Sequence, residues 1–101
     1  MTEPCDFSAV DARRLIGQRR LSPVELLESC IARIEAVDHA LNAVVARDFE
    51  RARAEAREAE IRVGRGDVLP VLHGLPVAIK DTENTAGLRT TYGSPIYRDH
   101  V

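Results

Sequence analysis

The sequence has 101 residues, of which 45% are hydrophobic and 30% are charged, a composition typical of a folded globular protein rather than a disordered chain. Its 14 basic and 16 acidic side chains are interspersed and give a formal net charge of -2, so no basic patch indicates binding to nucleic acid or to an anionic membrane. Cys5 and Cys30 lie far apart and lack C-x-x-C spacing, which favours free thiols over a disulfide framework or a zinc site.

The beginning of the chain, MTEPCDFSAVDARR, has an early acidic residue and lacks the apolar run of a signal peptide. No stretch approaches the roughly 18 apolar residues that a membrane-spanning helix needs. Together with the expected reduced thiols, these features predict a cytoplasmic protein without a membrane partner.

Capping signals predict three helices in the first two thirds of the chain. The first, at residues 8–17, fits the S-x-x-[DE] capping pattern at its start and has a glycine at its end. The second, at residues 22–41, has the strongest start, because Ser22 as the cap is followed by proline and, three residues after the cap, by glutamate. The third helix, at residues 48–63, ends before two nearby glycines.

Apolar residues at helical spacing predict which faces of these helices point inward. On the second helix they are Val24, Leu27, Ile31, Ile34 and Leu41. On the third helix they are Ala52, Ala56, Ala59 and Val63, and the charged pairs expected on its solvent side are Arg51 with Glu55 and Glu58 with Arg62. The apolar faces are typical of an ordinary core. The charged pairs are typical of a surface exposed to solvent.

After the third helix, a nearly unbroken apolar run ends in Lys80 and Asp81, a pattern typical of a strand buried on both faces. It predicts one strand at about 75–80 and, between turn residues, a second at about 88–92. Helices followed by strands predict the α/β class, with residues 1–101 forming the N-terminal part of a single domain. The sheet is expected to be incomplete, because two strands alone are only marginally stable.

Lys80 is the first candidate for chemistry, because ligands of open α/β sheets bind at the carboxyl ends of the strands. Burial there would favour the neutral amine, which can accept a proton near neutral pH. The alternative from the residues alone is a solvated turn in which Lys80 and Asp81 form a surface ion pair. Asp81 has two open roles: it could orient Lys80, or it could end the strand and bond nearby amides.

A family resemblance is carried by three ordered stretches, at residues 72–81, 84–87 and 90–94. Together they resemble the lysine-bearing segment of the amidase signature family. Upstream segments are similar to the N-terminal helices of that family. They are residues 21–26, 33–34 and 41–43 and the alanine-rich helix from Ala52. The resemblance therefore extends over almost the whole chain.

The resemblance implies a hydrolase that cleaves a carboxylic amide C–N bond with a serine nucleophile, a second serine with a cis peptide bond, and a lysine. Lys80 matches the family lysine, which relays a proton through the second serine to activate the first. Backbone N–H groups of a Gly/Ser-rich loop would stabilise the oxyanion, and water would hydrolyse the acyl-enzyme. The implied partner is a small-molecule amide, and no metal or organic cofactor is implied.

In that family the Gly/Ser-rich stretch with both serines lies downstream of the lysine segment, and no such stretch occurs before Val101. We therefore expect this chain to be an N-terminal piece that is catalytically silent alone. Ser94 fits a turn after the lysine rather than a nucleophile, and His73 fits a loop residue that hydrogen-bonds the backbone rather than a base.

Two other functions stay open at this point. One is a non-enzymatic helical interaction module, in which the alanine face of the third helix and the incomplete sheet would dock a partner chain. The other lies within the same family: the glutamine-hydrolysing subunit of a tRNA-dependent amidotransferase, which would release ammonia for a partner.

Overall fold

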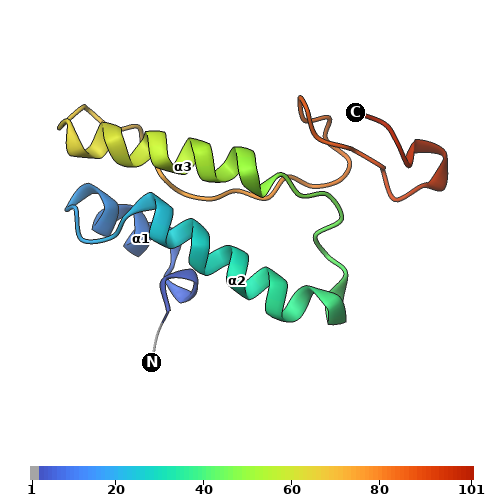
Figure 1. The fold of residues 1–101 in the computed structure, drawn as a ribbon, viewed down its shortest axis with the longest axis horizontal. Coiled ribbons are helices and arrows are strands. Elements are labelled where there is room, and N and C mark those ends of the chain that lie inside the picture. Colours follow the sequence, from blue (N-terminus) through green and yellow to red (C-terminus); the bar gives the residue numbers. More distant parts are fainter. Residues whose placement is uncertain (1–2) are drawn as a thin grey trace.

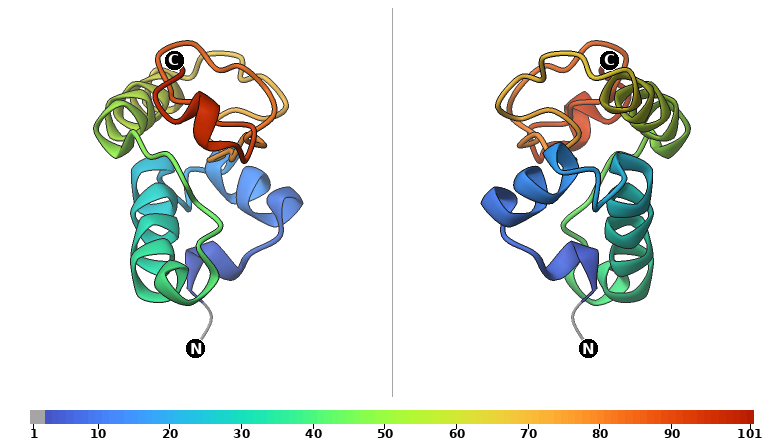
Figure 2. Two further views of the ribbon diagram at one scale, coloured as in Figure 1. Left: turned by 90° about the vertical axis from the view of Figure 1, so that its right-hand side faces the viewer. Right: turned by 90° about the vertical axis from the view of Figure 1, so that its left-hand side faces the viewer.

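The computed structural model describes residues 3–101, which form three α-helices and two short 3-10 helices (Figure 1). In chain order they are η1 (Pro4–Asp6), α1 (Ala9–Gly17), α2 (Pro23–Leu41), α3 (Phe49–Gly64) and η2 (Pro95–Tyr97). Helices α2 and α3 run side by side in opposite directions, and α1 lies near the end of this pair where α2 begins (Figures 1 and 2). The three α-helices begin and end within one residue of the ranges that the capping signals predict.

Each α-helix begins at a capping side chain. Oxygen atoms of Ser8, Ser22 and Asp48 accept hydrogen bonds of 3.1 Å from backbone N–H groups in the first turns of α1, α2 and α3. Such a bond satisfies an N–H group that a helix leaves unpaired at its start. The Ser22 hydroxyl also donates to Glu60 at 2.6 Å, which ties the start of α2 to α3.

Two apolar clusters hold the helices together. The first joins α1, the start of α2 and the end of α3 through Ala12, Ile16, Leu21, Leu26 and Val63. The second joins α2 to α3 through Leu27, Ile31 and Ala56. The small Ala56 side chain allows close approach of the two helices. Leu41, which was expected on the inward face of α2, is 69% exposed at the last residue of that helix.

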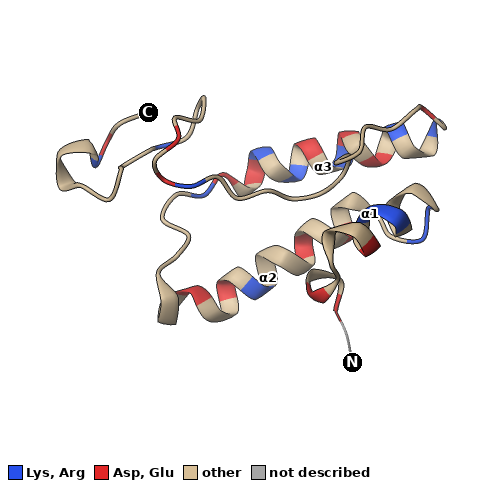
Figure 3. Cartoon of the chain, turned by 180° about the vertical axis from the view of Figure 1, so that it is seen from behind, with Lys and Arg blue, Asp and Glu red and all other residues tan. Residues whose placement is uncertain are grey.

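Acidic and basic residues are interspersed along α3 (Figure 3). The expected pair Arg51–Glu55 forms at 3.4 Å on the helix surface. The expected partner of Glu58, Arg62, instead lies 3.7 Å from Asp67. Exposed pairs of this kind contribute little to stability, so apolar packing holds α3 on α2. None of the helices in the described residues has the length and apolar character needed to cross a lipid bilayer.

The predicted strands, and with them the α/β class, are wrong: residues 3–101 contain no β-strand. Residues 75–80, expected as a strand buried on both faces, form no strand ladder, and Val77 is 80% exposed. Residues 88–92 are likewise irregular. A strand is stabilised by hydrogen bonds to neighbouring strands, and a lone pair of strands is marginal in water. The apolar run instead places Leu75 against the first cluster while the chain runs along α3 (Figure 1).

Arginine side chains of the helices bind the backbone of this irregular segment. Arg13 of α1 donates two hydrogen bonds, of 3.2 and 3.1 Å, to the carbonyl oxygen of Pro70. Arg51 of α3 donates one of 2.8 Å to the carbonyl oxygen of Ala86. These bonds satisfy backbone carbonyl groups on either side of Lys80, and they fix the two ends of the segment that leads to and from it.

His73 and Gly74 form the contact by which the segment crosses the helices. The His73 ring nitrogen Nε2 lies 3.0 Å from the carbonyl oxygen of Ala59, so the expected backbone hydrogen bond is confirmed. Gly74 has a φ of +82°, and a Cβ atom there would lie 3.0 Å from Pro23 and 3.2 Å from Ile16. Only glycine fits both the left-handed conformation and this close approach.

Asp38, in the last turn of α2, organises the linker to α3. Its Oδ1 atom accepts hydrogen bonds from the amides of Ala43 at 2.8 Å and Val44 at 3.1 Å, and its Oδ2 atom lies 2.9 Å from the Arg47 guanidinium group. The side chain is buried. The Val44 amide, with the Ala43 amide and Arg47, holds the pKa of Asp38 below its usual value.

Replacing Asp38 by asparagine is expected to lower the melting temperature at neutral pH, because the charge opposite Arg47 and one acceptor are lost. A carboxyl group whose pKa is lowered by folding stabilises the folded state above its unfolded pKa, about 3.9, and this stabilisation is lost as the pH falls through the lower folded value. The difference in melting temperature between parent and variant should therefore be larger at pH 7 than at pH 3.

Thermal unfolding followed by circular dichroism at these two pH values checks the prediction. Asp11→Asn is the matched control, because Asp11 forms an exposed pair with Arg14 at the surface of α1. Equal losses at pH 7 and pH 3 for Asp38→Asn would contradict the assigned role of the carboxylate.

Candidate active site

Lys80 lies at the end of the apolar run, where the chain turns back. Its carbonyl oxygen accepts a hydrogen bond of 3.0 Å from the amide of Glu83, which closes a turn over residues 80–83. The Lys80 side chain is exposed, so residues 3–101 do not provide the burial that a strand would have given it. The lysine therefore sits on a turn rather than at the edge of a sheet.

Asp81 is bound to the chain ten residues downstream. Its Oδ1 atom accepts a 2.7 Å hydrogen bond from the amide of Thr91, and its Oδ2 atom accepts one from the Thr91 hydroxyl. The Asp81 carbonyl oxygen accepts a third, of 2.9 Å, from the amide of Tyr92. The hydrogen bonds from Thr91, first from its hydroxyl and then from its amide, hold the pKa of Asp81 below its usual value.

The carboxylate of Asp81 forms no ion pair with Lys80 among the residues that the structure describes. Both of its oxygen atoms are directed toward Thr91. The surface ion pair that the sequence allowed as the alternative is therefore not formed in this part of the chain.

The segment that binds Asp81, residues 90–92, makes further contacts of its own. Thr90 is only 3% exposed, and its amide donates a 2.8 Å hydrogen bond to the carbonyl oxygen of His100. The Tyr92 hydroxyl donates to Asn84, and the Tyr92 ring packs edge-on against Tyr97 with ring centres 5.1 Å apart. The turn that carries Lys80 is thus fastened to a segment that makes contacts of its own with Tyr97 and His100.

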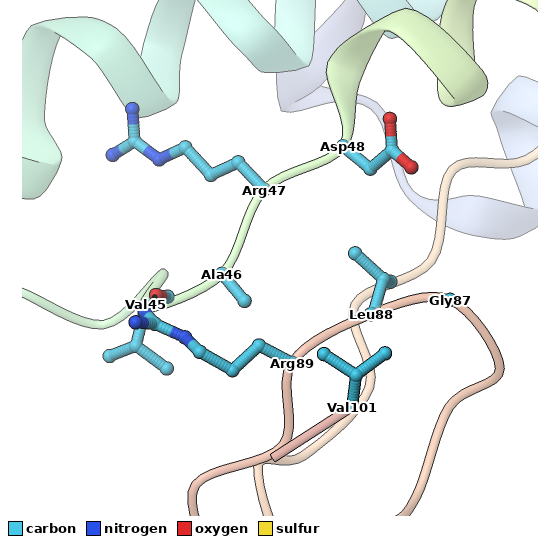
Figure 4. Close-up of a pocket in the computed structure, with 8 residues that line it drawn as sticks. All are labelled: Val45, Ala46, Arg47, Asp48, Gly87, Leu88, Arg89 and Val101. Atoms are coloured by element: carbon cyan, nitrogen blue, oxygen red, sulfur yellow. Dashed lines mark hydrogen bonds between the residues drawn. The ribbon is translucent and has the colours of Figure 1, made fainter. Parts of the chain in front are cut away.

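An open hollow of about 390 Å³ lies between the linker from α2 to α3 and residues 87–89 (Figure 4). The Arg89 side chain reaches across it to donate a 2.6 Å hydrogen bond to the carbonyl oxygen of Val45. Lys80 does not line this hollow. The candidate site is therefore the Lys80 turn and the segment bound to it, and the hollow is a separate feature.

A family model described as Amidase matches residues 25–101, which include α3 and the Lys80 turn. The chain belongs to the amidase family. The match confirms the resemblance drawn from the sequence, and it covers the segments on both sides of the Asp81–Thr91 contact.

Curated amidase-family relatives resemble this chain over nearly its whole length. A glutamyl-tRNA(Gln) amidotransferase subunit of Beijerinckia indica subsp. indica is 43% identical over 103 residues, covering 100% of this chain and 20% of that protein. The corresponding subunit of Koribacter versatilis is 42% identical over 93 residues, 91% of this chain and 19% of that protein. The AtzE subunit of the 1-carboxybiuret hydrolase of Pseudomonas sp. (strain ADP) is 43% identical over 83 residues, 82% of this chain and 18% of that protein. The chain thus spans about one fifth of the length of these relatives.

The serines of this amidase-family chain do not gather around Lys80. Ser8 and Ser22 cap helices, as described above, and Ser29 accepts a 3.0 Å hydrogen bond from the amide of Cys5. The amide of Ser94 donates a 2.9 Å hydrogen bond to the carbonyl oxygen of Thr91, so its expected place in a turn is confirmed, and its hydroxyl caps η2 by accepting a 3.3 Å hydrogen bond from the amide of Ile96. Each serine in the described part of the chain has a structural partner there.

Thr91 is the residue of this site that sequence reasoning missed. It is separated from Asp81 by ten residues of irregular chain, and no periodicity links two positions in such a segment. A further signal for Lys80 is present in the sequence: it is the only lysine among the 14 basic residues. Arginine stays protonated and cannot act as a base, so Lys80 is the one basic side chain among these 14 that could release a proton.

Proposed function

We propose that this chain supplies the lysine of an enzyme that hydrolyses a carboxylic amide C–N bond. The supporting observation is the amidase-family match over residues 25–101, within which Lys80 occupies the segment that resembles the lysine-bearing part of that family. One relative, the AtzE protein, is also named as part of a hydrolase. Because the chain spans about one fifth of its relatives, the activity is proposed for a longer protein.

In the proposed reaction, Lys80 accepts a proton from a second serine as that serine takes the proton of the nucleophilic serine, whose oxygen attacks the amide carbonyl carbon. Backbone N–H groups of a Gly/Ser-rich loop stabilise the negative charge that develops on the carbonyl oxygen. The proton then passes back from Lys80 through the second serine to the leaving nitrogen as the C–N bond breaks. Water attacks the resulting acyl-enzyme by the same proton path and releases the carboxylic acid.

A lysine must be neutral to accept this proton, and burial favours the neutral amine. Lys80 is exposed in residues 3–101, and the serines in that part of the chain have structural partners. The proposal therefore places both catalytic serines and the cover over Lys80 in other parts of a longer protein. The 101-residue chain alone is accordingly expected to be inactive.

The test is a chimera in which residues 1–101 replace the matching part of the Beijerinckia protein, a relative whose match covers the whole chain. We expect the amidotransferase assembled with this chimera to hydrolyse glutamine, measured as glutamate formation, and the isolated chain to be silent in the same assay. A chimera that folds by circular dichroism but is inactive beside an active parent would refute the proposal. Hydrolysis by the isolated chain, lost on substitution of Lys80, would refute the placement of the serines elsewhere.

A second function, the glutamine-hydrolysing subunit of a tRNA-dependent amidotransferase, is favoured by the names of the Beijerinckia and Koribacter relatives. It predicts that the tagged protein co-purifies from its own cells with a second amidotransferase subunit, identified by mass spectrometry. Hydrolysis of free amides in the absence of a second subunit would favour an amidase that acts alone.

The interaction-module alternative loses the surfaces on which it depended. The alanine face of α3 is already packed against α2, where Ala56 is buried beside Leu27 and Ile31. The incomplete sheet, its other docking surface, is absent from residues 3–101. We therefore do not propose this function.

A further inference from the structure

We propose that Asp81 and Thr91 form a positioning pair that fixes the direction in which the Lys80 side chain leaves the backbone. The inference rests on the proposed function, because it assigns these two residues a task only if Lys80 transfers protons. Neither residue touches the reacting atoms in this proposal. Both act through the backbone that carries Lys80.

The first step of the argument is the link between Asp81 and Lys80. The peptide group that joins them is planar, so a constraint on Asp81 also limits the orientation of Lys80. The carboxylate accepts two hydrogen bonds from Thr91, and the Asp81 carbonyl oxygen accepts a third from Tyr92. The carbonyl oxygen of that same peptide group, which belongs to Lys80, accepts a 3.0 Å hydrogen bond from the amide of Glu83. The backbone of Lys80 is therefore held at its C-terminal peptide group.

The second step is the anchoring of Thr91. Its hydroxyl oxygen also accepts a hydrogen bond of 3.4 Å from the amide of Gly93, and its neighbour Thr90 is buried and bound to His100. A positioning residue works only when its own orientation is fixed by surrounding contacts. Thr91 meets this condition on both its backbone and its hydroxyl.

The third step separates positioning from charge. An ion pair between Asp81 and Lys80 would require a negative charge, whereas the contact with Thr91 requires only hydrogen-bonding capacity. The amide of asparagine accepts the Thr91 N–H through its oxygen and donates to the Thr91 hydroxyl oxygen through its nitrogen. Asp81→Asn should therefore keep most of the activity, while Asp81→Ala should lose the contact altogether.

The decisive variant is Thr91→Val, which keeps the branched shape and removes the hydroxyl. In the active chimera we expect it to lower kcat by about 10-fold to 100-fold with KM unchanged, because misplacing a reacting group by about 1 Å can cost a factor of 10². Thr91→Ser restores the hydroxyl and should restore kcat. Thr85→Val is the matched control, because it also removes a threonine hydroxyl, one that donates to the carbonyl oxygen of Glu83 outside the Asp81–Thr91 contact.

Backbone amide hydrogen exchange in the 101-residue chain itself gives a readout that needs no activity. Thr91→Val is expected to speed exchange at the amides of residues 91 and 92, and Thr85→Val is expected to leave both rates unchanged.

The outcomes separate the two proposals. An inactive unsubstituted chimera would overturn the proposed function and the pair with it. An active chimera in which Thr91→Val leaves kcat unchanged, or raises only KM, would overturn the pair alone. Unchanged amide exchange at residues 91 and 92 in Thr91→Val would also overturn the pair. If Asp81→Asn loses as much activity as Asp81→Ala, the negative charge of Asp81 matters, and an ion pair with Lys80 would replace the positioning role.

Discussion

Substitution of Lys80 by alanine is expected to lower kcat/KM of the active chimera by about 10³-fold or more, the scale seen when one member of a catalytic unit is removed. The proposed mechanism passes the proton through Lys80, which is the only lysine of the chain, and His73 is bound to the backbone of α3. Steady-state kinetics on glutamine, with folding checked by circular dichroism, measure the effect.

Lys80→Arg is the informative companion, because it keeps the positive charge and most of the length of the side chain. A guanidinium group does not release its proton in proteins, so Lys80→Arg should be as inactive as Lys80→Ala. Arg57→Ala, at an exposed position on α3, serves as the control and should leave kcat/KM unchanged. Substantial activity in Lys80→Arg would show that the lysine acts through its charge rather than as a proton carrier.

The helices could be predicted from the sequence because their signals are local. Ser22 caps α2 with a proline directly after it, and both the bond and the helix depend on residues within four positions of each other. The small residues of α3 at helical spacing likewise identify the face that packs on α2, and Ala56 is buried there.

The C-terminal third could not be predicted in the same way. The apolar run before Lys80 has the composition of a buried strand, but a strand exists only when another strand supplies its hydrogen bonds, and composition does not show whether one is present. In residues 3–101 the run is instead held by Arg13, His73 and Leu75 against the helices. Lys80 could be named as a candidate because it lies in a sequence motif. The hydrogen bonds between Asp81 and Thr91 could not be predicted, because they join residues ten positions apart in irregular chain.

Ile16→Ala is expected to have the largest effect on stability of any single substitution considered. Ile16 is 0% exposed and lies in the cluster that joins all three α-helices. Its side chain also packs closely against the backbone at Gly74. Truncating a buried isoleucine to alanine costs about 2–5 kcal/mol, because both the burial of the removed atoms and the contacts around the cavity are lost. Small domains have unfolding free energies of about 5–15 kcal/mol, so this loss removes a large part of the total.

Urea unfolding followed by circular dichroism measures the change, with Ile61→Ala as the matched control. Ile61 lies on α3 and is 59% exposed, so its truncation should change the unfolding free energy by less than about 0.5 kcal/mol. Because Ile16 supports both α1 and the crossing at Gly74, its loss should also speed amide exchange near Gly74 at urea concentrations below the transition. Equal effects of the two substitutions would mean that the helices and the Lys80 segment do not share the core described for them.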